Sequence, residues 1–395
     1  MKVYQINSVC GFGSTGRIAL DIADTLAANG DECRIGYGRG NCADSRAFRF
    51  ESDFEIKLHG LISRLTDRQG FYSTAATKRL IADIQQYDPD IIHLHNIHGY
   101  YLNADILFRF LRNYNRPVVW TLHDCWAFTG HCAYYSFAGC NRWKDGCHHC
   151  PQRKSYPASL LMDRSARNYQ QKEKLFSSLP NLTIVTPSDW LRGQVSKSFL
   201  HRYPSVTIYN GIDLNVFTPQ KADILEKYDL TDKKIVLGVA NVWEPRKGLQ
   251  DLTALSLLLP DEYQVVVVGL NEAQIEQLPK NMIGIQRTET AEELAQIYSA
   301  AHVYVNTSYE ETMGLTTVEA LACGTGVVVY DQTAVPEVIT NECGAVVPAG
   351  DISKLKDAVC NAAFLETACI EQSKNFEKNA QYSKYIALYN TLYQR

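Results

Sequence analysis

The stretch from residue 306 to residue 326, NTSYEETMGLTTVEALACGTG, carries the strongest chemical pattern in the chain. It is typical of a strand end, a turn that contains glycine, a helix and a second glycine turn. Such a helix N-terminus is predicted to face a ligand. Glu311 and Glu319 stand eight residues apart in this stretch. A carboxylate can bridge two vicinal hydroxyls, so these acids favour a ligand that contains a sugar.

The turn between the two acids suits an anion. Met313, Gly314 and Leu315 would offer backbone N–H groups at the start of the helix. A plainer interpretation is that Glu311 caps the helix and that Glu319 is a solvated surface residue. The apolar residues around Glu319 argue against this, because they place it within an otherwise buried helix face.

A second glycine-rich turn, GFGSTG, occupies residues 11–16 between a predicted strand and a predicted helix. This context fits the dinucleotide-binding fingerprint of a dehydrogenase. That fingerprint also needs an acid at the tip of the second strand, where this chain has GYGR at residues 36–39. A dehydrogenase is therefore not favoured. Gly13 and Gly16 predict a close approach of the backbone to a phosphate or sugar, or only a tight turn between strand and helix.

The elements that must position these residues alternate between short β-branched runs and helical segments, which predicts parallel α/β structure. A chain of 395 residues with 46% hydrophobic content exceeds the length of a usual single core. The pattern restarts after a polar segment between Asn210 and Lys234, so we predict two doubly wound, Rossmann-like sheets. The expected strands are KVYQINSV, ECRIGYG, IIHLHN, VVWTLHD, LTIVTPS and VTIYNG, then KIVLGVAN, YQVVVVG, MIGIQ, AHVYVNTS and GVVVYD.

Composition excludes several classes of function. The net charge of −4, with 21% charged residues, gives no general attraction to nucleic acid. The chain passes from Met1-Lys2 directly into a strand-like run, without an apolar leader or a run of membrane-spanning length, so we expect a cytoplasmic protein. In such a protein most of the twelve cysteines are expected to be free thiols.

Several motifs together resemble glycosyltransferase family 4, whose members are retaining enzymes of the GT-B fold. The spacing of Glu311 and Glu319 resembles the Glu-x7-Glu signature of that family. Residues 241–248, NVWEPRKG, resemble its basic loop, and residues 210–213, NGID, resemble the opening of its C-terminal domain. Residues 120–132, WTLHDCWAFTGHC, resemble the strand end whose histidine faces the donor sugar. With the cysteine-rich segment that follows, they are most similar to the branch that makes bacterial exopolysaccharide and capsule, including colanic acid transferases.

The resemblance implies two Rossmann-like domains that face each other across a cleft. Residues 1–208 would form the acceptor-binding domain, with a cysteine-rich insertion at 131–151. Residues 209–375 would form the nucleotide-sugar domain. Residues 376–395 would form a helix that returns to the first domain.

The resemblance also implies roles for single residues. Glu319 would bind the ribose hydroxyls, and Glu311 a hydroxyl of the donor sugar. Arg246 and Lys247 would clamp the diphosphate, although a solvated basic turn is the plainer interpretation of this pair. His123 would touch the sugar near the reacting carbon.

The chain departs from the family pattern at three places. The usual arginine after the first strand of the second domain is replaced by residues 239–241, VAN, so we expect Arg246 to take over its role. Met313 stands where phenylalanine is frequent, and Gly326 where proline is frequent. None of these changes removes a catalytic group. From the first domain, the loop that holds Gly13 would approach the phosphate and sugar.

Four cysteines of the insertion follow the pattern C-x7-C-x6-C-x2-C: Cys132, Cys140, Cys147 and Cys150. Four thiolates could close a tetrahedral structural zinc site. The first pair is more widely spaced than in common zinc ribbons, so free thiols or one labile disulfide are the alternatives. In either case the insertion is expected to shape the acceptor side rather than to do chemistry.

Two further segments have a plain and a functional interpretation. In IIHLHNIHG, the alternation of a strand puts His93 and His95 on one face, where they could bind a metal ion. A third ligand at suitable spacing is lacking, so the favoured interpretation is that His93, His95 and His98 are strand-end histidines near the cleft.

Residues 57–80 hold five lysines and arginines against one aspartate. Their apolar residues fall at helical spacing: Leu58, Leu61, Ile62 and Leu65. A helix on an anionic membrane is one interpretation, and a core-facing helix with a basic outer face is the favoured one.

The resemblance implies an enzyme that moves a sugar from a UDP- or GDP-sugar to a glycan or lipid-linked saccharide, with retention of configuration, in bacterial surface polysaccharide biosynthesis. No cofactor is expected for catalysis. The enzyme would act in the cytoplasm, peripherally at the inner face of the plasma membrane. The alternatives are a sugar-nucleotide epimerase of the same fold and a catalytically silent nucleotide- or glycan-binding scaffold.

Overall fold

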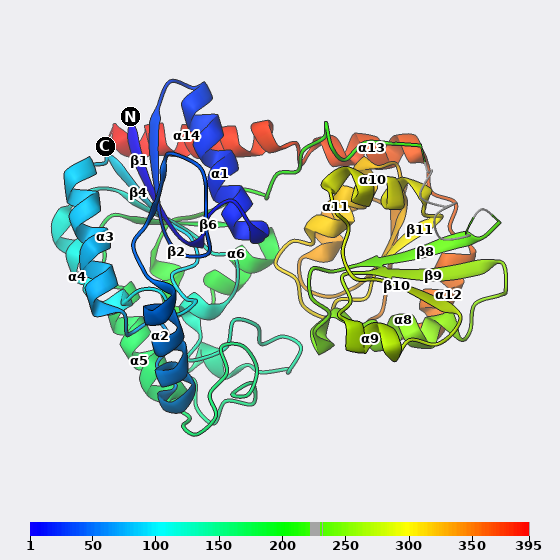
Figure 1. Cartoon of the computed structure of the whole chain (residues 1–395), viewed down its shortest axis with the longest axis horizontal. Coiled ribbons are helices and arrows are strands. Elements are labelled where there is room, and N and C mark those ends of the chain that lie inside the picture. Colours follow the sequence, from blue (N-terminus) through cyan, green and yellow to red (C-terminus); the bar gives the residue numbers. More distant parts are fainter. Residues whose placement is uncertain (222–229, 231, 395) are drawn as a thin grey trace. The chain divides into compact units, whose positions relative to one another are not determined.

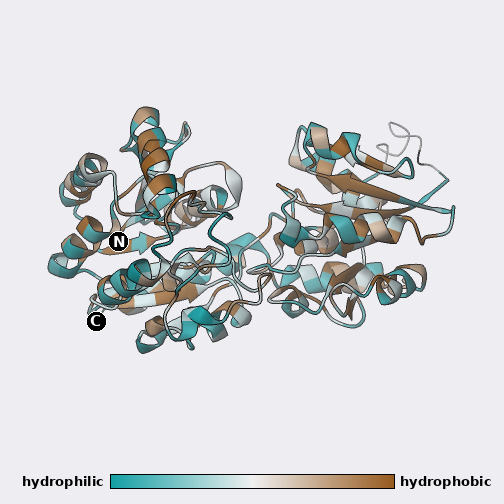
Figure 2. Cartoon of the chain, turned by 90° about the horizontal axis from the view of Figure 1, so that it is seen from below, coloured by the Kyte–Doolittle hydropathy of each residue, from teal (hydrophilic) through white to brown (hydrophobic). Residues whose placement is uncertain are grey.

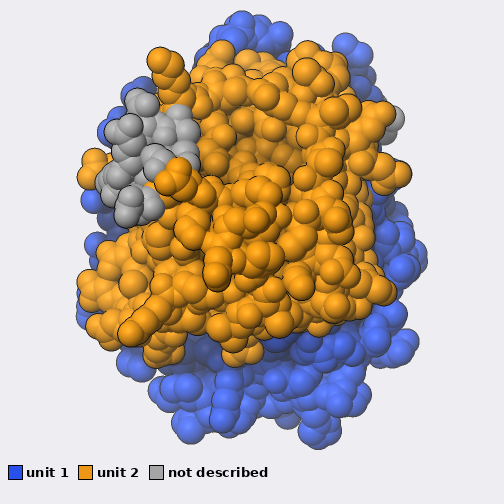
Figure 3. All heavy atoms as spheres, turned by 90° about the vertical axis from the view of Figure 1, so that its right-hand side faces the viewer, with its two compact units in different colours: residues 1–209, 381–395 blue, residues 210–380 orange. Residues whose placement is uncertain are grey.

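The chain divides into two compact units (Figures 1 and 3). The computed structural model describes residues 1–221, 230 and 232–394. Unit 1 contains Met1–Tyr209 together with Gln381–Arg395, and unit 2 contains Asn210–Ala380. Part of the polar segment expected between Asn210 and Lys234 lies outside the described residues.

Unit 1 is built on a seven-stranded parallel sheet with the order β3-β2-β1-β4-β5-β6-β7. The helices α3, α4, α5 and α6 pack on one face, and α1 and α14 pack on the other. Because both faces are covered, the central strands are continuous β-branched and apolar runs. The strands are β1 (Lys2–Val9), β2 (Glu32–Arg39), β3 (Ala47–Arg49), β4 (Ile91–Leu94), β5 (Val118–Thr121), β6 (Leu182–Thr186) and β7 (Ser205–Thr207). The helices are α1 (Gly13–Ala28), α2 (Asp53–Thr66), α3 (Thr74–Tyr87), α4 (Ala104–Tyr114), α5 (Ser165–Phe176), α6 (Asp189–Val195) and α14 (Lys378–Tyr393).

Unit 2 repeats the plan with a six-stranded parallel sheet of order β10-β9-β8-β11-β12-β13. The helices α10, α11 and α13 pack on one face, and α8 and α12 pack on the other. The strands are β8 (Lys234–Val239), β9 (Tyr263–Val268), β10 (Met282–Ile285), β11 (Val303–Asn306), β12 (Val327–Tyr330) and β13 (Gly344–Val347). The helices are α8 (Leu249–Ser256), α9 (Glu272–Glu276), α10 (Ala291–Ala300), α11 (Leu315–Ala322), α12 (Ile352–Cys360) and α13 (Glu366–Lys374). The prediction of two doubly wound parallel sheets is confirmed.

Each sheet has one place where the strand order reverses, between β1 and β4 in unit 1 and between β8 and β11 in unit 2. Loops that leave two such strands in opposite directions open a crevice at the carboxyl edge of the sheet, which is where α/β proteins bind ligands. The glycine turn and the histidine segment follow β1 and β4. The basic loop and the first of the two acids follow β8 and β11. The topology therefore places the sequence motifs at the two switch points.

The last helix, α14, completes the core of unit 1 with two tyrosines. Tyr389 OH lies 2.6 Å from Nδ1 of His93, and Tyr385 OH lies 3.0 Å from Oγ1 of Thr121. All four side chains are fully buried. A buried polar group without a hydrogen bond costs free energy, so α14 stabilises the sheet by satisfying two polar strand residues as well as by apolar packing.

The helix α2 departs from our expectation. Its leucines Leu58, Leu61 and Leu65 are exposed, whereas His59 and Ser63 are buried. The expectation that the apolar side of this helix faces the core is therefore wrong. The side that carries His59 faces inward instead, and Nδ1 of its buried ring lies 2.7 Å from Ser73 Oγ.

Figure 2 shows hydrophobic and hydrophilic segments alternating along the surface helices. Among the described helices, none combines the length and the apolar character needed to cross a membrane.

We predict that Tyr389→Phe lowers the free energy of unfolding by about 1–3 kcal/mol, because it leaves the buried Nδ1 of His93 without its hydroxyl partner. Chemical denaturation monitored by tryptophan fluorescence measures this change. Tyr393→Phe, at an exposed position near the end of the same helix, is the matched control and should behave as the wild type. Equal stability of both variants would contradict the role given to this hydrogen bond.

Candidate nucleotide-sugar site

The basic loop of unit 2 is fixed by a glycine that packs against the end of β11. Gly248 has a φ of 73°, in the left-handed region that favours glycine. A Cβ atom at this position would lie 2.3 Å from the carbonyl oxygen of Thr307. The hydroxyl of Thr307 donates to the carbonyl oxygens of Lys247 and Gly248, each at 3.0 Å. The loop after β8 is therefore held directly on the loop after β11.

This close packing brings three of the predicted residues together. The ammonium of Lys247 forms an ion pair with the carboxylate of Glu311, and both side chains are largely buried. Ser308 Oγ also donates to Glu311 Oε1, at 3.1 Å. Arg246 donates through Nη1 to the carbonyl oxygen of Glu310, at 2.9 Å. Positive charge from one loop thus stands beside the acid of the other.

Glu311 is ionised in this setting. Burial acts to raise the pKa of its carboxyl, but the charges of Lys247 and Arg246, with the hydrogen bonds from Lys247 and Ser308, outweigh burial and lower the pKa. The carboxylate is therefore a hydrogen-bond acceptor at neutral pH. An acceptor that remains ionised beside two cations suits the hydroxyls of a ligand whose diphosphate lies on the cations.

The helix α11 begins beside this ion pair. Gly314 is its N-cap, with a φ of 89°, and Leu315 is its first residue. The first turn contains no acidic residue, so its N–H groups and the helix dipole are open to an anion. Met313 is buried, and its sulfur lies 3.1 Å from the backbone nitrogen of Asn210. The predicted turn thus follows Glu311 directly in the chain, with the side chain of Met313 buried.

Glu319 lies one turn further along α11. It is half-buried, with Val318 and Ala320 buried on either side. Its Oε2 accepts a hydrogen bond of 3.0 Å from the hydroxyl of Tyr298, on α10. The structure therefore places the two glutamates on one loop and helix, but only Glu311 takes part in the ion pair with Lys247.

In unit 1 the glycine turn opens α1. Gly13 is the first residue of the helix, with a φ of 64°. A Cβ atom at Gly13 would meet no atom within 4 Å, whereas one at Gly16 would lie 3.1 Å from Val9 and 3.3 Å from the backbone nitrogen of Gly11. Gly16 is therefore needed for packing between helix and strand. Gly13 leaves open space above the backbone, which suits the approach of a ligand.

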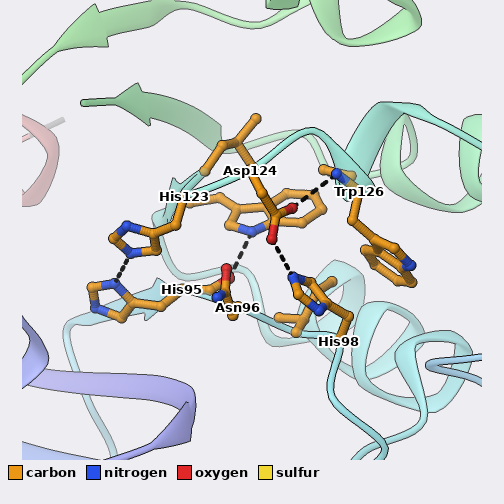
Figure 4. A pocket seen from close by; sticks show the side chains of 10 residues that line it. His95, Asn96, His98, His123, Asp124 and Trp126 are labelled. Carbon is orange, nitrogen blue, oxygen red and sulfur yellow. Dashed lines mark hydrogen bonds and ion pairs between the residues drawn. The ribbon is translucent and has the colours of Figure 1, made fainter. Parts of the chain in front are cut away.

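His123 lines a small pocket at the carboxyl ends of β4 and β5 (Figure 4). Its Nε2 lies 3.0 Å from Nδ1 of His95, whose own Nε2 lies 2.8 Å from Oε1 of Gln5. The amide nitrogen of Gln5 donates to the carbonyl oxygen of Ala19 at 2.8 Å, which turns the amide oxygen toward His95. An amide oxygen only accepts, so His95 carries its proton on Nε2 and accepts at Nδ1 from Nε2–H of His123.

This chain of hydrogen bonds fixes the state of His123. Burial lowers the pKa of His123 to about 4 and the pKa of His95 to well below the usual value, so both rings are neutral. The proton of His123 sits on Nε2, and its Nδ1 is an acceptor. Gln5, almost 120 residues away in sequence, thereby sets the tautomer of the predicted sugar-facing histidine.

The acid next to His123, Asp124, had no predicted role. Asp124 accepts a hydrogen bond of 2.7 Å from His98 Nε2 and another of 2.9 Å from the backbone nitrogen of Trp126 (Figure 4). Burial acts to raise the pKa of Asp124, but the charge and hydrogen bond of His98 lower it, so the carboxylate is ionised. Its position directly after His123 was the only sequence signal for it.

The histidines in and directly after β4 are held by hydrogen bonds within unit 1. His93 lies between Thr121 Oγ1, at 2.8 Å, and Tyr389, and His95 lies between His123 and Gln5. Within the described ranges, no three histidine, cysteine, aspartate or glutamate side chains are grouped so that they could hold a metal ion. The favoured interpretation of strand-end histidines agrees with these contacts.

The cysteines of the insertion line a second pocket, and no disulfide joins any of the described cysteines. The pocket brings together the four predicted thiols: Cys132, Cys140, Cys147 and Cys150. The backbone nitrogen of Gly130 donates to Cys147 Sγ at 3.1 Å, and the pKa of Cys150 is lowered to about 7, mainly by a hydrogen bond from Cys132. The thiols are neighbours but are not arranged around one centre. The zinc site therefore stays a prediction.

Solved structures share the fold of this chain. Sucrose-phosphate synthase from Thermosynechococcus elongatus superposes with a TM-score of 0.74 at 18% identity, over 100% of this chain and 99% of that one. Anabaena Alr3699/HepE in complex with UDP superposes with a TM-score of 0.69 at 15% identity, over 99% and 100%. At these identities the likeness shows the fold alone. It is the GT-B fold of two Rossmann-like domains.

Sequence comparison identifies the family. Residues 15–216 match the family described as Glycosyltransferase Family 4, and residues 233–363 match Glycosyl transferases group 1. The chain belongs to glycosyltransferase family 4, and the predicted resemblance is confirmed.

Individual relatives are more distant. The colanic acid biosynthesis glycosyl transferase WcaC of Escherichia coli is 28% identical over 54% of this chain and 55% of its own length. The D-inositol 3-phosphate glycosyltransferase of Mycolicibacterium smegmatis is 30% identical over 45% of this chain and 43% of its own length. The O-antigen chain mannosyltransferase B of Escherichia coli is 23% identical over 86% and 84%. The chain thus matches about half the length of the first two relatives.

We predict about one zinc ion per chain in protein purified under reducing conditions, and a lower melting temperature for Cys147→Ser, because the site would lose a ligand. Elemental analysis and a thermal melt measure the two effects. Cys360→Ser, in unit 2, is the control and should keep the metal. Metal-free wild-type protein would show that the four cysteines are free thiols.

Proposed function

We propose that the protein transfers a sugar from a nucleotide-diphosphate sugar to a glycan or lipid-linked saccharide, with retention of configuration, in bacterial surface polysaccharide biosynthesis. The observation that carries the proposal is the ion pair of Lys247 with Glu311, beside Arg246 and the N-terminus of α11. This arrangement joins two cations, open backbone N–H groups and an ionised acid on two loops that pack against each other.

In this proposal the cations serve the leaving group. When the bond between the sugar and the diphosphate breaks, negative charge builds up on the phosphate. Arg246 and Lys247 stabilise that charge together with the N–H groups that follow Gly314. The ion pair with Glu311 keeps the ammonium of Lys247 in place before the donor arrives. The diphosphate therefore meets charges that are already oriented.

The acids and the histidine would hold the rest of the donor. Glu311 accepts from a hydroxyl of the sugar, and Glu319 accepts from the ribose hydroxyls while Tyr298 steadies it. His123 touches the sugar near the reacting carbon as a neutral ring, since a buried imidazolium would be costly there. Gly13 leaves room for the phosphate and sugar on the side of unit 1.

The relatives support the classes of donor and product. Structures of Alr3699/HepE contain UDP and UDP-glucose, which supports a UDP-sugar for this chain, with a GDP-sugar as the alternative. The relatives named for colanic acid and O-antigen chain synthesis support a surface polysaccharide. Retention follows from the family resemblance. In that mechanism the departing phosphate helps to deprotonate the acceptor, and no side chain becomes covalently attached to the sugar.

Two other functions would give different results in simple assays. An epimerase of the same fold would release free nucleotide without any acceptor. A silent scaffold would bind nucleotide sugars without consuming them. Donor turnover with and without candidate acceptors separates these cases from transfer. A thermal-shift screen of UDP-, GDP- and ADP-sugars identifies the base and the sugar.

We predict that transfer needs no divalent cation, because Arg246 and Lys247 supply the charge that a metal would bring to the diphosphate. Lys247→Ala should lower turnover about 100-fold or more at saturating donor, since its charge acts chiefly on the departing phosphate. Arg246→Lys should also be harmful, because an ammonium cannot grip phosphate with two parallel hydrogen bonds. Lys354→Ala, an exposed lysine of the same unit, is the control.

The measurement is the initial rate in EDTA and in excess magnesium or manganese. Activity that EDTA abolishes and the metal restores would overturn this account of the leaving-group site, as would wild-type turnover in Lys247→Ala.

We predict that Glu319→Gln weakens nucleotide binding about tenfold, because a charged hydrogen bond to the ribose becomes a neutral one. Titration calorimetry with the free nucleotide measures the change. Glu276→Gln, on an exposed part of the same unit, should bind as the wild type does. Unchanged affinity in Glu319→Gln would refute the assignment.

A further inference from the structure

The helix α2 turns its apolar side away from the protein. Phe54, Leu58, Leu61 and Leu65 are each between 40% and 74% exposed. Their spacing of four, three and four residues places them along one face of a helix. Surface helices of globular proteins bury such a stripe against the core. The opposite arrangement exposes apolar area to water and indicates a partner for this face.

The buried side of α2 explains this orientation. His59 and Ser63, one turn apart, are buried, and the ring of His59 makes edge-on contacts with Tyr72 and Tyr100. The helix is well formed, because Ser52 and Glu55 make a capping box at its start. The exposed stripe is therefore a stable feature of the fold.

A neighbouring loop extends the apolar surface. Leu160, Leu161 and Met162 are at least half exposed, and the backbone nitrogen of Leu160 donates to the carbonyl oxygen of Arg64 at 2.7 Å. The loop thus lies against the last turn of α2. We call the following seven residues the apolar patch: Phe54, Leu58, Leu61, Leu65, Leu160, Leu161 and Met162.

The charges around the apolar patch are mainly positive. The two acids at the start of α2 are neutralised, because Asp53 pairs with Arg49 and Glu55 pairs with Arg79 at 2.7 Å. Lys57 and Arg64 stand on α2 between the apolar residues, and within the described residues neither pairs with an acid.

The segments next to the patch have the same sign of charge. Residues 57–80 hold five lysines and arginines, of which Arg79 is paired with Glu55, against one aspartate, and residues 151–164 hold three against one. The aspartate of the first segment, Asp67, is buried against His131 and does not reach the surface.

We propose that the apolar patch docks on an anionic lipid surface. Leucine, phenylalanine and methionine side chains would enter the boundary between headgroups and acyl chains, while the lysines and arginines contact the anionic headgroups. A second copy of the chain fits this face less well, because a symmetric contact would bring the positive segments of two copies together. An interfacial helix of this kind binds a membrane without crossing it.

Docking has a consequence that rests on the proposed function. Unit 1 is the acceptor-binding domain in that proposal, and a lipid-linked saccharide is confined to the membrane surface. Binding through unit 1 would hold the enzyme where its acceptor is concentrated. The docking itself depends only on the apolar patch and its charges, so it can be tested independently of any transfer assay.

The test is co-sedimentation of the whole chain with vesicles of phosphatidylcholine alone, or of phosphatidylcholine and phosphatidylglycerol in equal parts. Wild-type protein should sediment with the mixed vesicles and much less with phosphatidylcholine alone, and binding should weaken as salt is raised. Leu61→Glu should reduce binding to the mixed vesicles about tenfold or more, because a charge replaces an inserted leucine. Leu365→Glu, a leucine of matching exposure on unit 2, should bind as the wild type does.

Three results would overturn the proposal. They are a wild type that stays in solution with both kinds of vesicle, equal binding by Leu61→Glu and Leu365→Glu, and a wild-type dimer in sedimentation velocity that Leu61→Glu dissociates. The last result would assign the face to a second copy. Both positions are exposed, so thermal melts should match the wild type. Binding of the free nucleotide, measured by titration calorimetry in the absence of vesicles, should also be unchanged, which separates failure of docking from failure of the proposed function.

Discussion

The missing side chain of Gly248 is the constraint on which the unit 2 site depends. With a Cβ only 2.3 Å from the carbonyl oxygen of Thr307, the loop after β8 could not lie on the loop after β11. The pairing of Lys247 with Glu311 requires that contact, as does the bond from Arg246 to the backbone of Glu310. A single backbone approach therefore sets the positions of three charged side chains that come from two parts of the sequence.

In unit 1, the side chains at the switch point are positioned in a different way. Its histidines are oriented by hydrogen bonds, and the amide of Gln5 gives the chain of bonds its direction. Burial keeps the rings neutral, so no counter-charge is needed for them. The switch point of unit 1 therefore presents neutral, oriented rings, whereas that of unit 2 presents paired charges.

Much of this could be predicted from the sequence, for identifiable reasons. Parallel strands buried on both faces give long β-branched runs, so nearly all strands were found. The exceptions, β3 and β13, are edge strands of three and four residues. The chain of bonds from Gln5 to His123 could not be predicted, because it joins β1 to the segments after β4 and β5, across almost 120 residues. Periodicity found the helix α2 but could not tell which side faces the core, since that depends on the partners of His59.

The return of the chain to unit 1 also bears on how the protein is made. The side chains of His93 and Thr121 obtain their tyrosine partners only from α14, near the end of the chain. During synthesis, one sheet face of unit 1 is therefore covered only by α1 while all of unit 2 is added. Unit 2 is continuous in sequence and can fold first. Chains that stall before Tyr385 would expose that face and become targets for chaperones and proteases. Cutting the gene at the unit boundary would give the same defect, so a separate unit 1 needs α14 joined to it by a new connection.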